Sequence, residues 1–200
     1  MRMLRITILL LIPFNFFSKI PSTNKFEKKW AFWHPFAALK IKKIYKKAMP
    51  FYQDAFIKTE LDVFESGGKL DAFRHIFFMA AFSQKIKIKK VRKLGLAHEK
   101  GNFREFLKSK NEEGERLDSI GTEMDLKNNE LGFKLSENNS VKKMSLSDLK
   151  KLVISEIKTG KAFILKRNSA GKYVDCENTV IDFEKFKTIW ATPRCLIPSA

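Results

Sequence analysis

The run from residue 69 to residue 84 constrains the fold more than any other part of the chain. Its interior consists almost entirely of phenylalanine, isoleucine, methionine and alanine. A helix with this composition is apolar on most of its surface, and such a helix is normally covered by other elements. Ser66-Gly67-Gly68 interrupts the chain just before it. We therefore expect a central helix from about Lys69–Asp71 to Gln84, with the other elements packed around it.

Apolar residues at helical spacing predict further helices. They are expected over residues 35–48, 52–64, 85–107, 123–129, 146–158 and 181–190. Pro50 and Gly132 should end two of them, and Ser145 or Ser147 should cap the helix over 146–158. Ala162–Leu165 and Lys172–Val174 flank a turn sequence, which predicts a small β-hairpin. The fold class expected is mainly α: a single helical domain with a small β-hairpin near the carboxy end.

The amino terminus carries a targeting signal. Arg2 and Arg5 precede an apolar run over residues 6–17. This run is too short to span a bilayer, which takes about 20 residues, and is typical of a secretory signal peptide. We expect a signal peptide (or an uncleaved anchor) over 1–22, a linker over 23–29 and a single helical domain over 30–200, with a motif core over 67–132. The protein is then exported: periplasmic, cell-envelope or secreted.

Export places the two cysteines in an oxidising compartment. Cys176 and Cys195 could then form a disulfide that closes the carboxy-terminal segment. Two free thiols are the alternative, because sequence separation does not show whether the Cα atoms approach within bonding range.

The net charge of +17 raises the question of a nucleic-acid partner. Most of this charge comes from lysine, which lacks the planar fork that reads bases and phosphates. No specific nucleic acid is therefore expected as a partner. An anionic envelope component or a small substrate is the better expectation, with the membrane contacted only through the leader if it is uncleaved.

The aromatic cluster from Trp30 to Phe36 is expected in the core, with His34 at a loop or helix start.

Polar residues in apolar surroundings mark the candidate site. Asp71, Arg74 and His75 lie at i, i+3 and i+4, and so share one face of the central helix. Burying them without partners would cost about 1–3 kcal/mol each. Two later segments are similar, Ala97-His98-Glu99 and the run over 124–129, in which Asp125, Asn128 and Asn129 repeat this spacing.

If the three segments converge, several chemistries are open. His75 and His98, with Asp71 and Glu99, could form an acid/base set. His75, His98 and Asp71 could instead bind a divalent metal, the possible cofactor. Substrate-binding roles would fall to the remaining polar residues of the motifs. These are Arg74, Asp125, Asn128 and Asn129.

The alternative is structural. Asp71 follows two glycines and could cap the central helix, and Arg74 could tie helices together. The motifs would then form an interhelical polar network in a non-enzymatic envelope or binding domain.

The motifs resemble those of an uncharacterised family, a domain of unknown function in bacterial secreted proteins and in polymorphic-toxin or wall-associated proteins. They are His34-Pro35, Gly68-x-x-Asp-Ala-Phe-Arg-His75, Ala97-His-Glu99 and the pattern Met-Asp-Leu-x-Asn-Asn-x-x-Gly over 124–132. The family pattern often has Gly-Arg after the paired asparagines, whereas Phe133 follows Gly132 here, so no role for that arginine is carried over.

The resemblance implies a helical fold and a shared polar site, and it supplies no substrate. Toxin-type relatives favour a hydrolase-like, optionally metal-assisted site acting on a phosphodiester, lipid or cell-wall substrate. Its residues would be Asp71, Arg74, His75, His98, Glu99, Asp125, Asn128 and Asn129.

Overall fold

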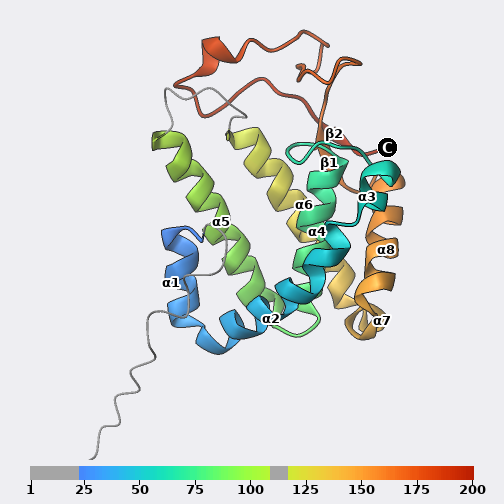
Figure 1. Cartoon of the computed structure of the whole chain (residues 1–200). Coiled ribbons are helices and arrows are strands. Elements are labelled where there is room, and N and C mark those ends of the chain that lie inside the picture. The colour runs from blue at the N-terminus through green and yellow to red at the C-terminus, as the bar shows by residue number, and fades with distance from the viewer. Residues whose placement is uncertain (1–22, 109–116) are drawn as a thin grey trace, which may run out of the picture.

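The computed structural model describes residues 23–108 and 117–200, so the predicted signal peptide over 1–22 lies outside the described residues. The described part contains eight α-helices and a two-stranded antiparallel sheet, which confirms the mainly α fold (Figure 1). No helix in these ranges is long and apolar enough to cross a membrane. The helices are α1 (Lys25–Trp33), α2 (Pro35–Tyr52), α3 (Ala55–Glu60), α4 (Lys69–Ser83), α5 (Ile88–Lys108), α6 (Ser119–Glu137), α7 (Asn139–Lys143) and α8 (Leu146–Lys158).

Helix α4 is the centre of the fold, as its composition predicts. Phe73, Ile76 and Phe77 are fully buried, and α2, α5, α6 and α8 all pack against α4. The polar face of α4 meets α6, which makes the most extensive contact with it. The central helix therefore holds together the core and the candidate site.

Helix α6 is longer than the sequence predicts. It begins at Ser119, before the expected start at residue 123, and continues through Gly132. Residues 109–116, which precede it, lie outside the described residues. Gly132 does not end the helix but brings α6 close to α4: a Cβ atom there would lie 2.6 Å from the carbonyl oxygen of Ile76 and 3.1 Å from the Met79 Cβ.

We expect Gly132→Ala to lower the free energy of unfolding by about 1–3 kcal/mol, because the methyl group must push two helix backbones apart. Alanine alone would favour the helix by about 1 kcal/mol. If Gly132→Ala instead raises the melting temperature, measured by circular dichroism, the close approach of α6 to α4 is contradicted.

The amino-terminal part departs from three predictions. The expected linker over 23–29 is wrong from Lys25 onward, because Asn24 and Glu27 form a capping box that starts α1. Pro50 does not end the second helix, which runs to Tyr52, so this proline lies inside its last turn. The helix expected over 52–64 shortens to α3, which Asp54 caps.

The prediction of an aromatic core from Trp30 to Phe36 is correct for Trp30 alone. Its indole is buried and Nε1 donates to the carbonyl oxygen of Lys90, 3.0 Å away. Phe32, Trp33 and Phe36 are exposed. His34 lies at the start of α2, as expected.

The carboxy-terminal segment forms the sheet, but with a different partner from the one predicted. Strand β1 (Phe163–Leu165) pairs with β2 (Leu196–Pro198). Residues 172–174 contribute only isolated bridges, one of them Arg167 with Tyr173 across the predicted turn. The helix expected over 181–190 is a short 3-10 turn, Phe183–Phe186.

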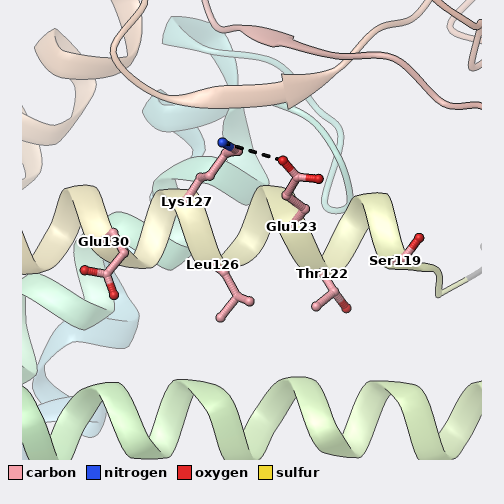
Figure 2. Close-up of a pocket in the computed structure, with 6 residues that line it drawn as sticks. All are labelled: Ser119, Thr122, Glu123, Leu126, Lys127 and Glu130. Carbon is pink, nitrogen blue, oxygen red and sulfur yellow. Dashed lines mark ion pairs between the residues drawn. The ribbon is translucent and has the colours of Figure 1, made fainter. Parts of the chain in front are cut away.

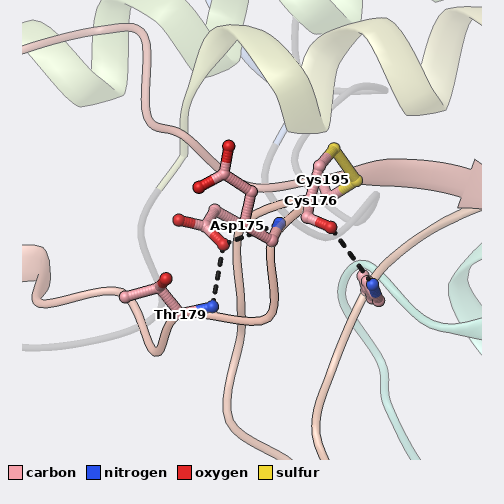
Figure 3. The surroundings of a disulfide bond; sticks show 6 residues. Asp175, Cys176, Thr179 and Cys195 are labelled. Carbon is pink, nitrogen blue, oxygen red and sulfur yellow. Dashed lines mark hydrogen bonds between the residues drawn. A yellow bond between two sulfur atoms is a disulfide. The ribbon is translucent and has the colours of Figure 1, made fainter.

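A disulfide closes this segment, as the cysteine pair predicts. Cys176 and Cys195 are bonded, with Cα atoms 4.8 Å apart (Figure 3). Beside them, Asp175 accepts hydrogen bonds from the backbone N–H groups of Glu177 and Thr179, which fixes a tight turn. The disulfide links Cys195, the residue directly before β2, to Cys176, which lies in the loop after β1.

Candidate metal-binding site

The candidate site lies where α4 meets α6, with α5 beside them. Asp71 and His75 project from α4, and Asp125 projects from α6. Ligand atoms of these three side chains lie within 4.8 Å of one another, and the three residues are largely buried. The structure thus brings together two of the motifs that are separated in sequence.

His75 is held in one orientation and one tautomer. Burial lowers the pKa of His75, so the ring is neutral. Its Nδ1 lies 3.1 Å from Oδ1 of Asn129, an acceptor, which places the ring proton on Nδ1. Nε2 then presents a lone pair, consistent with the Arg74 guanidinium nitrogen 3.3 Å away. This is the arrangement in which an imidazole binds a metal.

Asp125 faces that lone pair. Its Oδ1 lies 3.1 Å from His75 Nε2. Burial raises the pKa of Asp125 well above its usual value, and the nearby charge of Asp71 raises it further. The raised pKa favours the protonated, neutral form of Asp125, which avoids an ionised oxygen against the lone pair of His75.

Asp71 is fixed from two sides. Its Oδ2 accepts from the backbone N–H of Gly67, 2.7 Å away, and its Oδ1 accepts from Arg74 at 2.5 Å. Asp71 does not cap the N-terminal N–H groups of α4, since Asp62 accepts from Lys69 and Leu70. That leaves Asp71 facing the site, while Arg74 has 40% of its side chain exposed.

Glu99 brings a third carboxyl group from α5. It is buried, Oε2 accepts from Asn102 at 3.0 Å, and Oε1 has no hydrogen-bond partner among the described residues. Burial, followed by the charge of Asp125, raises the pKa of Glu99 to about 7. A carboxyl group with this pKa can exchange protons at neutral pH.

Two predicted site residues have other contacts. The His98 ring bonds Glu27 of α1 through Nδ1 at 3.0 Å, and this bond raises the pKa of His98. Asn128 is fully buried and bonds both backbone groups of Phe163, each at 2.9 Å. Asn128 therefore anchors β1, and its contacts do not support substrate binding.

The open groove of about 550 Å³ beside α6 is not at this site. It is lined by residues on another side of the helix, including Thr122, Leu126 and Glu130 (Figure 2). Leu126, the neighbour of Asp125 in the chain, is half-buried and lines this groove.

Sequence analysis missed a second buried polar cluster at the start of α6. Asp118 is almost completely buried, caps α6 through Gly121 and pairs with Arg194. Thr192 also donates to its carboxylate. Aspartate is a common N-cap residue, but the other partners of Asp118, Thr192 and Arg194, lie more than 70 residues away in the chain.

A comparison with family models gives one match. A family described as a domain of unknown function, DUF6973, covers residues 28–161. The chain belongs to this family. Every residue of the candidate site lies within the DUF6973 match, which ends before β1. No curated protein and no solved structure matches the chain.

Proposed function

We propose that this DUF6973 protein is an exported bacterial domain with a hydrolase-like site that acts with a divalent cation. The ligands would be Asp71, His75 and Asp125. Asp125 thus replaces His98, the third metal ligand expected from the sequence. The substrates considered are a phosphodiester, a lipid or a cell-wall component, and the resemblance to toxin and wall-associated proteins supports this range.

The single observation that carries the proposal is the buried triad in which His75 Nε2 faces the carboxyl groups of Asp125 and Asp71, at 3.1 and 3.6 Å. One imidazole nitrogen and two carboxylates suit zinc or manganese. Asn129, bonded to the opposite ring nitrogen, would serve as the outer partner that orients a metal-binding histidine.

The charge balance supports a cation as well. Asp71, Asp125 and Glu99 are three buried carboxyl groups, and Arg74 is the cation bonded to Asp71. Without a cation, the raised pKa of Asp125 favours its protonated form, and Glu99, with a pKa of about 7, is about half protonated at neutral pH. A divalent ion would displace the Asp125 proton, because metal ligands must be deprotonated.

Within this proposal, the remaining residues take distinct roles. A bound divalent ion would polarise the substrate or lower the pKa of a water molecule. Glu99, with its pKa near 7, would accept the proton of that water. Arg74 is partly exposed and would bind the anionic part of the substrate.

We expect isothermal titration to detect one Zn²⁺ or Mn²⁺ site on the full chain. His75→Ala or Asp125→Asn should weaken the affinity at least about 100-fold, and Asn129→Ala about 10–100-fold. Binding should release a proton, measured by comparing buffers of different ionisation enthalpy. His98→Ala is the matched control and should retain affinity, since its ring bonds Glu27. If no divalent ion binds at millimolar concentration, the proposal fails.

A structural role is the second candidate, and one observation favours it. Asp71 is already satisfied by Gly67 and Arg74, so it serves the fold without any ligand. In that case His75→Ala would lower the melting temperature sharply with and without added metal. Under the metal proposal, added Zn²⁺ should raise the melting temperature of the wild type but not that of His75→Ala.

A further inference from the structure

The junction of α1 and α2 exposes large apolar side chains. Phe32, Trp33, Phe36 and Leu39 are 69%, 67%, 80% and 56% exposed. They follow one another along the turn between the two helices, at the end of the molecule away from β1 and β2 (Figure 1). Contiguous exposed aromatic residues on a folded domain mark an interaction surface.

Exposed lysines flank these apolar residues on the same helix faces. On α1, Lys25, Lys28 and Lys29 precede Phe32 and Trp33 at i, i+3, i+4, i+7 and i+8. This spacing places all five on one side of α1.

The same pattern continues on α2. Phe36 and Leu39 share their side of the helix with four exposed lysines, at spacings of three and four residues. These are Lys40, Lys43, Lys46 and Lys47. We call this set of eleven residues on α1 and α2 the aromatic–lysine face.

We propose that the aromatic–lysine face docks on an anionic lipid bilayer. The apolar side chains would enter the interface between headgroups and acyl chains, and the lysines would contact the headgroups. A surface with aromatic and leucine residues at its centre and lysines around them is the form of an interfacial membrane anchor.

Charge complementarity favours lipid as the occupant. Between residues 23 and 53 the chain has eight lysines and one acidic residue, Glu27, which is bonded to His98. The stretch contains no arginine, the residue that reads phosphates in nucleic acids bidentately.

The apolar run upstream of α1 also favours a lipid bilayer as the partner. The apolar run over residues 6–17 ends eight residues before α1 begins at Lys25. Export through a membrane would bring this face to the bilayer surface first. A chain that keeps its leader would hold the face against that surface permanently.

Tryptophan fluorescence of the full chain tests the proposal directly. Vesicles of phosphatidylcholine with phosphatidylglycerol, brominated on the acyl chains, should quench the emission. Trp33→Phe should remove most of that quenching, because Trp30 is buried and Trp190 packs on Phe103 and Phe106 near the far end of α5. The leader contains no tryptophan, so its own insertion does not mimic this result.

Two further variants separate the contributions. Replacing Lys40, Lys43 and Lys47 with glutamine should weaken partitioning about fivefold per lysine, at an energy of about 1 kcal/mol each near an anionic surface. Phe36→Ser should reduce the quenching, whereas Phe56→Ser, an exposed aromatic on α3, should leave it unchanged.

Either of two results would overturn the proposal. One is vesicle binding with equal quenching in the wild type and Trp33→Phe, which would show that Trp33 does not enter the bilayer. The other is quenching that does not depend on phosphatidylglycerol. Because metal affinity is measured without vesicles, failure here leaves the cation proposal standing.

Discussion

Replacing Asp118 by alanine is expected to lower the free energy of unfolding by about 3–5 kcal/mol. The Asp118 carboxylate is buried and pairs with Arg194, whose Nε lies 2.8 Å from Oδ2. The substitution leaves a buried guanidinium without its counter-ion and also removes the cap of α6. Urea unfolding with the disulfide intact should show the loss as a lower midpoint.

A double variant provides the control. In Asp118→Ala with Arg194→Met, no buried charge is left alone, so part of the stability should return. If the single variant loses less than about 1 kcal/mol, the pair is not the tie between α6 and the carboxy-terminal segment.

Glu99→Gln is expected to stabilise the protein above pH 7 by about 3 kcal/mol. The folded-state pKa of Glu99 is raised from 4.5 to about 7, and one pKa unit corresponds to about 1.4 kcal/mol. Between these values the unfolded chain loses the Glu99 proton while the folded chain keeps it. The wild type therefore loses stability as the pH rises from about 4.5 to 7, and the loss levels off above 7.

Glutamine remains neutral and can still accept the bond from Asn102. The stability of Glu99→Gln should match the wild type near pH 4 and exceed it increasingly toward pH 8 in urea unfolding. Glu123→Gln, an exposed carboxylate on α6, should change stability by less than about 0.5 kcal/mol at every pH. Parallel curves for Glu99→Gln and the wild type would contradict a raised pKa.

The strongly periodic helices were predictable from the sequence. The continuous apolar composition of α4 predicts that helix, and an apolar stripe with a serine before it predicts α8. The failures come from tertiary contacts. Gly132 is a helix breaker by propensity, yet the close approach of Ile76 makes it a packing residue inside α6. Residues 181–190 are apolar enough for a helix, but they lie within the loop that the Cys176–Cys195 disulfide closes and form only a short 3-10 turn.

The site was predictable where spacing defines a helix face. Asp71 with His75, and Asp125 with Asn129, project into a common region as their spacing requires. His98 and Glu99 are adjacent on α5 and so point in directions about 100° apart. Which of them faces α4 could not be known without α1, whose residue Glu27 engages His98.

The pairing of Asp118 with Arg194 bears on where this protein can be cut. The matched family region stops at residue 161, yet a side chain 33 residues beyond that boundary neutralises a carboxylate buried within it. In a fragment trimmed to the matched region, the buried carboxylate of Asp118 at the start of α6 would have lost its counter-ion, Arg194. The unit that folds cooperatively is therefore larger than the unit recognised by homology.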